Sequence, residues 1–353
     1  MSAGAGTSPA TPPAVGAAAA ATGPGTDGGH RLRRRTVRHQ VVRRRSRRAA
    51  GRRGQLVAGA AALYTALIAL SPWLPNGPVN LASLWQTVLP WSGLGVAALL
   101  LLAALRRSAP AAVTVLLPAL VWTVLFAPTL LDKRTAGGDL TVVSHNVNED
   151  NPDPRRTARA LANSGADVLA VEELASRTQE TYQHELAAGY SYSQVRGGIG
   201  LWSKYPLQAV EPVDIMPWTR ALRATVQTPD GPVALYVAHL ASVRVRLDAG
   251  FTTARRNEAA AKLASAVQSE PLPRIVVLGD FNGSFDDSAL HTLTGPLRSA
   301  QQEAGDGFGF TWPARLPVVR IDQILVKGIT PRSAWTLPDT GSDHLPVAAS
   351  LRL

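Results

Sequence analysis

Three long apolar segments before residue 132 limit this chain more than any other feature. They run from Gln55 to Leu74, from Trp85 to Leu105 and from Pro110 to Leu131, and none contains a charged residue. Each has about 20 residues, which is enough to cross a hydrocarbon core of roughly 30 Å. Three such segments in succession favour transmembrane helices over the buried helical core of a soluble protein. A signal peptide is a poor description, because the first apolar run begins after residue 50.

Flanking charge predicts how these helices are oriented. The stretch from Arg31 to Arg53 contains twelve arginines and no acid, and Arg106 and Arg107 stand between the second and third segments. Pro75 to Leu84, between the first and second, carries no charge. Since positively charged loops are retained in the cytoplasm, we predict a multi-pass cell-membrane protein with a cytoplasmic N-terminus. Everything after Leu131 is then extracellular.

Composition separates the basic arm from the rest of the chain. The formal net charge is +11, but Thr135 to Leu353 holds 20 Lys and Arg against 23 Asp and Glu, a net of −3. Residues 1–30 are rich in Ala, Gly and Pro, which predicts a disordered tail. The predicted organisation is this tail, an arginine-rich arm over 31–53, a three-helix membrane region over 54–134 and a catalytic domain over 138–353. Because the chain has no cysteine, a metal must be held by oxygen and nitrogen ligands.

From Asp139 onward, short strands alternate with helical stretches and with turns rich in Gly, Pro and Asp. The predicted strands are 140–144, 167–171, 199–202, 222–227, 233–237, 275–278, 320–326 and 347–351, and the predicted helices are 154–164 and 252–270. Strands interleaved with a few helices indicate a mixed or antiparallel α/β or α+β domain.

The stretch from Arg274 to Asp287 predicts a buried strand that carries polar groups at its end. An apolar run ends at Gly279, where the backbone is free to turn, and Asp280 and Asn282 follow. At a spacing of two in extended chain, these side chains point the same way. A carboxylate beside a carboxamide suits a metal-bound phosphate oxygen and an oriented water. The alternative is an Asx-turn, in which both residues only cap the backbone.

Further polar residues stand at or near the ends of other predicted strands: Asn146, Glu173, His239, Asp322, Asp343 and His344. They can meet only if those ends share one edge, as in layered α/β folds. Oxygen ligands suit Mg²⁺, and a histidine paired with an aspartate activates water or protonates a leaving group. Asn146 as a turn residue, Glu173 as an acid at a helix N-terminus and His239 as a structural histidine are the alternatives. Asp322 lies inside an apolar strand and requires a cationic partner, for which His344 is a candidate.

Seven motifs occur in the order seen in the endonuclease/exonuclease/phosphatase (DNase I-like) superfamily, which this chain resembles over roughly residues 138–353. They are Ser144-His145-Asn146-Val147, DVLAVEE over 167–173, GIGLWSKYPL over 198–207, Ala238-His239-Leu240, Gly279-Asp280-Phe281-Asn282, Arg320-Ile321-Asp322 and Ser342-Asp343-His344-Leu345-Pro346. The resemblance does not extend to the apolar segments.

The resemblance implies a four-layer α/β sandwich, in which two packed mixed β-sheets are flanked by helices and preceded here by three transmembrane helices. It also implies metal-dependent hydrolysis of a phosphate ester. Carried over by motif, Asn146, Glu173 and Asp343 would hold Mg²⁺, with Mn²⁺ or Ca²⁺ as alternatives. Asp280 and Asn282 would orient the attacking water and a phosphate oxygen.

The resemblance also assigns the histidines. His344 would be the catalytic histidine, held by Asp322, and His239 would bind phosphate or assist the leaving group. Glu172 stands where the family has a glutamine, so Glu172 and Glu173 are both candidates for the metal-facing acid.

These observations predict a membrane-anchored, metal-dependent phosphoester hydrolase whose partners are the lipid bilayer and a nucleic acid, a phospholipid or a small phosphodiester. A domain at −3 attracts a nucleic acid weakly. A local patch of Arg244, Arg246, Arg255 and Arg256 would supply the missing attraction. The alternative is a non-enzymatic, membrane-tethered binding module. The oligomeric state is not predicted.

Overall fold

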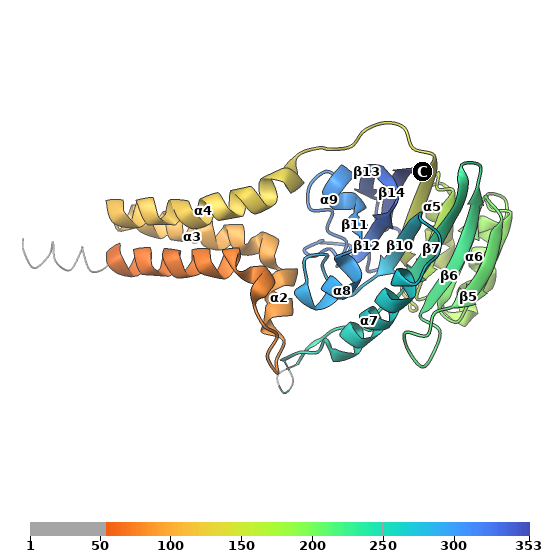
Figure 1. The fold of residues 1–353 in the computed structure, drawn as a ribbon, viewed down its shortest axis with the longest axis horizontal. Coiled ribbons are helices and arrows are strands. Elements are labelled where there is room, and N and C mark those ends of the chain that lie inside the picture. The colour runs from red at the N-terminus through yellow and green to blue at the C-terminus, as the bar shows by residue number, and fades with distance from the viewer. Residues whose placement is uncertain (1–53, 247, 249) are drawn as a thin grey trace, which may run out of the picture. The chain divides into compact units, whose positions relative to one another are not determined.

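The computed structural model describes residues 54–353 apart from 247 and 249 (Figure 1). The predicted disordered tail and arginine-rich arm, residues 1–53, lie outside the described residues. A helical region comes first, and a domain built on two β-sheets follows from Leu140.

The helical region contains one long span and several shorter helices. They are the helix Gly54–Ala69, the 3-10 helix η1 (Ser71–Trp73), α2 (Leu81–Thr87), the 3-10 helix η2 (Leu89–Trp91), α3 (Ser92–Leu105) and α4 (Ala109–Leu130). Among the described residues, only α4, with 22 residues, is long and apolar enough to cross a membrane by itself. Of the three predicted spans, this one alone is therefore supported as a continuous helix.

The predicted span Trp85–Leu105 is not one straight helix. Its first residues belong to α2, and α2 meets the stretch Leu89–Leu105 at a bend of 68°. Pro90 lies in η2 at this bend, where its missing N–H and its ring prevent a continuous hydrogen-bond ladder. The α3 part has 14 residues and rises about 21 Å at 1.5 Å per residue. Hydropathy alone does not register this break, because proline does not interrupt an apolar run.

Each of the two main sheets has six strands. The first is ordered β13-β14-β1-β2-β4-β3, formed by Thr330–Thr336, Val347–Arg352, Leu140–Asn146, Val168–Glu172, Ile199–Ser203 and Tyr192–Arg196. The second is ordered β11-β12-β10-β7-β6-β5, formed by Arg298–Ser299, Asp322–Lys327, Ile275–Asp280, Gly231–Ala238, Ala221–Thr228 and Leu207–Pro212. Both are mixed, because β1 pairs with β2 and β7 with β10 in parallel, and the other pairs are antiparallel.

The sheets pack face to face and helices cover their outer faces. Val142 and Leu201 of the first sheet share a buried core with Leu235 and Val276 of the second. α5 (Pro154–Ala162) and α6 (Gln179–Leu186) pack on the first sheet, whereas α7 (Ala254–Gln268) and α8 (His291–Thr294) pack on the second (Figure 1). The predicted α/β sandwich is confirmed. Covering both faces of a central strand explains why 275–278 is apolar throughout.

Short elements complete the domain. They are the 3-10 helices η3 (Ser176–Thr178) and η4 (Ser288–Leu290), the helix α9 (Ala300–Ala304) and the two-stranded sheet of β8 (Val245–Arg246) and β9 (Gly250–Phe251).

Strand direction brings the predicted site residues to one edge. Asn146 ends β1, which is parallel to β2, and Asp280 ends β10, which is parallel to β7. The next strand, β12, is antiparallel to β10 and begins with Asp322, which is directly paired with Asp280. β14 is antiparallel to β1, and His344 comes just before it.

Candidate active site

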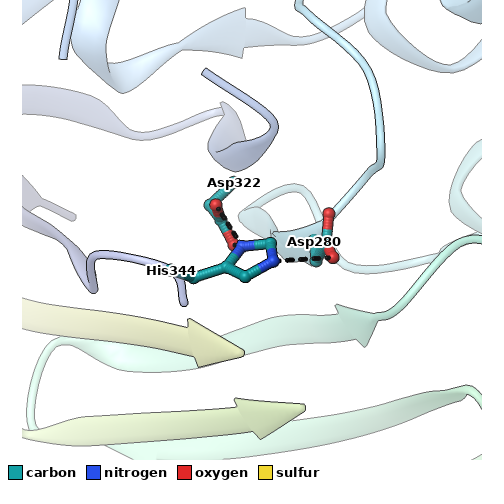
Figure 2. A group of neighbouring side chains, drawn as sticks. All are labelled: Asp280, Asp322 and His344. Atoms are coloured by element: carbon teal, nitrogen blue, oxygen red, sulfur yellow. Dashed lines mark hydrogen bonds and ion pairs between the residues drawn. The ribbon is translucent and has the colours of Figure 1, made fainter. Parts of the chain in front are cut away.

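The centre of the site is a buried cluster of Asp280, Asp322 and His344 (Figure 2). His344 Nδ1 lies 3.0 and 3.2 Å from the two carboxylate oxygens of Asp322. Figure 2 shows the imidazole between the two aspartates, with Nε2 4.0 Å from Asp280 Oδ2. Because a carboxylate only accepts hydrogen bonds, Nδ1 must carry a hydrogen, and this N–H donates a hydrogen bond to Asp322. Nε2 is therefore the ring atom that faces the rest of the site.

Burial and neighbouring charges raise the pKa values of two groups in this cluster, His344 and Asp280. Burial alone would lower the pKa of His344, but the charge and hydrogen bond of Asp322, with the charge of Asp280, raise it to about 10. Burial raises the pKa of Asp280 to about 7, with Asp322 adding to the rise and the His344 charge opposing it. The cluster thus combines a histidine whose charged form is favoured with a carboxyl group whose neutral form is favoured by burial.

Asp280 and Asn282 are close because of a turn, not because the chain is extended. Asn282 has a left-handed backbone with φ 47°, and its N–H donates to Asp280 Oδ1 at 2.8 Å. The extended-chain geometry expected for this pair is therefore wrong, and the Asx-turn that was its alternative is present. The turn still brings Asn282 Nδ2 to 3.2 Å from Asp280 Oδ2.

Gly279 is required for close approach to a neighbouring strand. Its φ is +137°, and a Cβ at this position would lie 2.0 Å from the carbonyl oxygen of Ala238 in β7. The glycine thus brings the end of β10 against the strand that leads to His239.

His239 lies on the other side of Asp280 and differs from His344 in its partner. Arg220 Nη1 donates to His239 Nδ1. A guanidinium can only donate, so Nδ1 is the acceptor and the ring proton is on Nε2. That nitrogen lies 3.4 Å from Glu173 Oε1 and 3.6 Å from Asp280 Oδ2, yet it makes no aligned hydrogen bond within the described part of the chain. Burial, followed by the charges of Arg220 and His344, holds the pKa of His239 well below its ordinary value.

Two oxygen-bearing side chains border the cluster at the ends of β1 and β2. Asn146 is buried, and its Nδ2 donates to Asp280 Oδ2 at 3.0 Å. Glu173 follows β2 with a left-handed φ of 54°, and 25% of its side chain is exposed. A non-glycine residue in this backbone region is strained, and such strain is concentrated at functional sites. Glu173 therefore presents an accessible carboxylate beside Asp280 and His239.

Glu172 is directed differently from Glu173. It is fully buried, and Ser144 Oγ donates to its Oε1 at 2.9 Å. Its Oε2 has no hydrogen-bond partner among the described residues. Burial raises the pKa of Glu172 well above its ordinary value, and the charges of Asp322 and Asp280 raise it further. Of the two candidates, Glu173 is the one open to solvent.

The donor set fits a divalent cation that prefers oxygen. Four acids gather at one edge, namely Glu172, Glu173, Asp280 and Asp322. Arg220, Arg320 and His344 are nearby cationic groups. Burial raises the pKa of Glu172 and of Asp280, and neighbouring carboxylates add to both shifts, so a cation at this edge would favour the ionised forms. Asp322 accepts from His344, so the remaining oxygen donors are those of Glu173, Asp280 and Asn146. Asn146 Oδ1 also accepts from the N–H of Asn148 at 3.1 Å.

The structure does not bring the Asp343 carboxylate into this cluster by a hydrogen bond. The residue is exposed, and its backbone carbonyl accepts from the N–H of Ala314 at 2.7 Å. Its side chain acts on the site through charge, since it helps to raise the pKa of His344.

Sequence reasoning missed Arg220 and misplaced Arg256. Arg220 precedes β6, and its carbonyl accepts from the N–H of His239 at 2.8 Å. The only signal for this pairing was an arginine just before a predicted strand. Arg256 was expected in an exposed basic patch but is fully buried and paired with Asp287 at 2.7 Å. Arg244 and Arg255 are exposed, as expected.

Comparisons with known proteins agree with this geometry. The sequence model of the Endonuclease/Exonuclease/phosphatase family matches residues 143–344. No curated protein matches the chain in sequence.

Solved structures share the fold at low sequence identity. An endonuclease/exonuclease/phosphatase from Bacteroides vulgatus is 18% identical with a TM-score of 0.52, covering 62% of this chain and 100% of that one. TDP2 of D. rerio, solved with a single-strand DNA product, is 19% identical with a TM-score of 0.51, covering 61% and 99%. A mannosyl-6-phosphatase from Bacteroides thetaiotaomicron is 16% identical with a TM-score of 0.50, covering 61% and 100%. The family match spans more than half of the sequence, and the chain therefore belongs to the Endonuclease/Exonuclease/phosphatase family.

Proposed function

We propose that this chain is a metal-dependent phosphoester hydrolase, anchored in a membrane with its catalytic domain outside the cell. The observation that carries the catalytic part is the cluster in which Asp322 holds His344 against Asp280. Hydrolysis of a phosphate ester needs a positioned water, a proton acceptor and positive charge at the phosphate. The chain supplies a candidate for each.

Asp280 is the candidate proton acceptor. With a pKa of about 7, its carboxyl group is a base matched to neutral pH. The Asx-turn occupies Oδ1, whereas Oδ2 faces the two histidines and Asn146. In this proposal Oδ2 takes a proton from the attacking water, and the Asn282 carboxamide helps to orient that water.

The two histidines supply donors for the phosphate. His344 is an imidazolium at neutral pH, and its Nε2–H is free to stabilise a phosphate oxygen or to protonate the leaving group. The buried Nε2–H of His239 lacks an aligned acceptor among the described residues, and a phosphate oxygen would provide one. Asn146 and Glu173 would hold the metal, and Asp343 would contribute at its edge. A bound divalent cation would neutralise phosphate charge and polarise the ester.

The membrane part of the proposal is supported by α4 and by the charge that flanks the helical region. α4 has the length and composition of a membrane span. The twelve arginines of Arg31–Arg53 favour a cytoplasmic location for the segment before the helices. Protease added to intact cells should therefore cleave the domain after Leu131. Full protection of the domain, under conditions that digest a known surface protein, would contradict the outward orientation.

The substrate is either a nucleic acid or a phospholipid or smaller phosphodiester. The net charge of −3 over Thr135–Leu353 weakens general attraction to a polyanion. The burial of Arg256 removes one cation from the patch that would have compensated. Attachment close to a bilayer favours a lipid substrate. The same site could hydrolyse a nucleic acid or a lipid phosphodiester, so the test must include substrates of both kinds.

The test uses the full chain in detergent and in liposomes, with Mg²⁺ or with EDTA. Supercoiled plasmid, phosphatidylcholine vesicles and bis(p-nitrophenyl) phosphate are offered in parallel. We expect EDTA to abolish hydrolysis and His344→Ala to reduce it by about 10³-fold, within the range for loss of a general acid–base group. His184→Ala is the matched control, because His184 is exposed on α6.

The outcomes separate the functions. Nicking of plasmid identifies a nuclease, and headgroup release with intact plasmid identifies a phospholipid-directed enzyme. Turnover of the small ester alone indicates a smaller substrate. Hydrolysis that persists in His344→Ala or in EDTA would refute the proposed roles. Inactivity on all three substrates would favour a membrane-tethered binding module.

A further inference from the structure

The short helix α2 packs against the loop that follows the catalytic strand β10. Gln86 Oε1 accepts from the backbone N–H of Ser288 at 2.9 Å and from its hydroxyl at 3.0 Å. Ser83 Oγ donates to Asp287 Oδ1 at 2.9 Å. Ser83, Gln86 and Asp287 are at most 2% exposed. The helical region therefore makes specific, buried polar contacts with the active-site side of the domain.

Asp287, which accepts from Ser83, also forms a buried ion pair with Arg256. Its Oδ2 lies 2.7 Å from Arg256 Nη2, and both side chains are 0% exposed. Because no aligned hydrogen bond reaches Oδ2 from any described residue, the Arg256 charge is what compensates it. Such a pair is stable in a low-dielectric interior only when the remaining donors and acceptors are also satisfied. The other carboxylate oxygen, Oδ1, accepts from Ser83 Oγ at 2.9 Å and from the backbone N–H of Ala289 at 3.0 Å.

Arg256 in turn holds the backbone of the active-site turn. Its Nη1 donates to the carbonyl oxygen of Asn282 at 3.2 Å. Its Nε and Nη2 donate to Asn257 Oδ1 at 3.0 and 2.8 Å, which fixes the guanidinium on α7. The left-handed backbone of Asn282 is held on one side by the Asx-turn with Asp280 and on the other by this bond from Arg256 to its carbonyl.

Gly283 gives independent support for this contact. A Cβ at residue 283 would lie 2.6 Å from Arg256 Nη1, closer than side chains approach. A side chain at residue 283 would therefore displace the guanidinium or the Leu290 side chain, whose Cδ1 would lie 2.8 Å away.

We propose that Arg256 is a positioning residue for Asn282 and that α2 controls it through Ser83 and Asp287. The helical region then completes the active site as well as preceding it in the chain. The catalytic meaning of Asn282 rests on the proposed function, whereas the structural coupling does not. A disturbance of α2 would pass through Asp287 and Arg256 to the turn beside Asp280, although α2 carries none of the proposed catalytic residues.

The test compares Ser83→Ala with Thr87→Ala in the full chain in detergent. Both remove one hydroxyl from α2, but Thr87 Oγ1 bonds only the carbonyl of Ser83 within its own helix. We expect Ser83→Ala to lower kcat for bis(p-nitrophenyl) phosphate by about fivefold, which is less than the full loss of a hydrogen bond to a charged group because the Ala289 N–H still donates to Asp287 Oδ1. KM should change less than twofold. Amide hydrogen exchange over residues 282–290 should accelerate, and Thr87→Ala should change neither quantity.

Arg256→Lys and Gly283→Ala test the contact between Arg256 and the backbone carbonyl of Asn282. Lysine keeps the charge but has a single nitrogen, so it cannot satisfy Asn257, Asn282 and Asp287 together. Both variants should lower kcat more than Ser83→Ala and accelerate exchange over the same residues. If either fails to fold, Ser83→Ala still decides the question, because it removes only one oxygen atom.

The two readouts separate this inference from the proposed function. Wild-type exchange over 282–290 in Ser83→Ala would overturn the coupling, whatever the activity. Faster exchange with unchanged kcat would overturn the positioning role of Arg256. If the wild-type chain hydrolyses no phosphoester, the proposed function fails, and the exchange experiment still decides whether α2 controls the turn.

Discussion

Two buried histidines flank Asp280, and they have opposite electrostatic states. His344 and His239 place Nε2 4.0 and 3.6 Å from the same atom, Asp280 Oδ2. The pKa of His344 is raised to about 10, whereas that of His239 is held well below its ordinary value. Both rings are deeply buried, so burial alone cannot explain the difference.

The partner of Nδ1 decides between the two states. Asp322 accepts from His344 and stabilises an imidazolium, whereas Arg220 donates to His239 and stabilises a neutral ring. Both arrangements leave an N–H on Nε2 that faces the site. The site therefore combines a charged donor, His344, with a neutral donor, His239, and the residue that contacts Nδ1 decides which is which.

Among the three tests, Asp322→Asn should most reduce the difference between the pKa values of His344 and His239. It removes the carboxylate that raises the pKa of His344, so burial should then dominate and favour the neutral ring. We expect kcat/KM at neutral pH to fall by about 10²–10³-fold, within the range for a general acid–base group. NMR titration of the His344 ring would show the pKa moving down. Asp230→Asn, an exposed aspartate in the β6–β7 turn, is the control. An unchanged His344 pKa would contradict the account of this histidine.

The pH dependence of activity should distinguish Asp280 from His344. Activity should fall by about tenfold per unit as pH drops below about 7, because the Asp280 carboxyl group gains a proton. It should also fall as pH rises through about 10, because His344 loses its proton. Saturating Mg²⁺ should move the lower limb to more acidic pH, since a nearby cation favours the carboxylate. A profile of kcat/KM that is flat between pH 5 and 8 at limiting Mg²⁺ would contradict the role of Asp280 as a base.

Arg220→Met should have the smallest effect of the three. Removing the donor to Nδ1 should raise the pKa of His239 and free the ring to change tautomer. Activity should fall by about tenfold, because a hydrogen bond involving a charged group contributes about 1.5 kcal/mol. NMR of the His239 ring checks the tautomer. Arg155→Met serves as control, because Arg155 is exposed. A neutral ring with its proton still on Nε2 would show that Arg220 does not set the tautomer.

Local patterns in the sequence predicted the eight inner strands of the two main sheets and the helices α5 and α7, but none of the edge strands β3, β5, β11 and β13. The apolar runs of β1, β10 and β12 and the amphipathic stretches of α5 and α7 are properties of consecutive residues. Asp322, which was predicted inside β12 and is in fact its first residue, required a cationic partner because its neighbours are apolar, and His344 is that partner.

The errors arose where distant segments meet. Arg256 and Arg255 are adjacent in sequence, yet one is buried against Asp287 and the other is exposed. Hydropathy gave the segment Trp85–Leu105 no break, although its first residues belong to a helix that packs on the domain. The limits of the domains and the roles of the site residues, including Asp343, stay predictions.

By itself the sequence determined which residues carry charge, which runs are apolar and in which order the family motifs occur, because these depend on chain neighbours. The tertiary structure alone decided that Arg220 sets the state of His239 and that Ser83 reaches Asn282 through Asp287 and Arg256. Side-chain hydrogen bonds and ion pairs depend on separations of a few ångströms. Residues about 200 positions apart, such as Ser83 and Asp287, reach such separations only when the chain has folded.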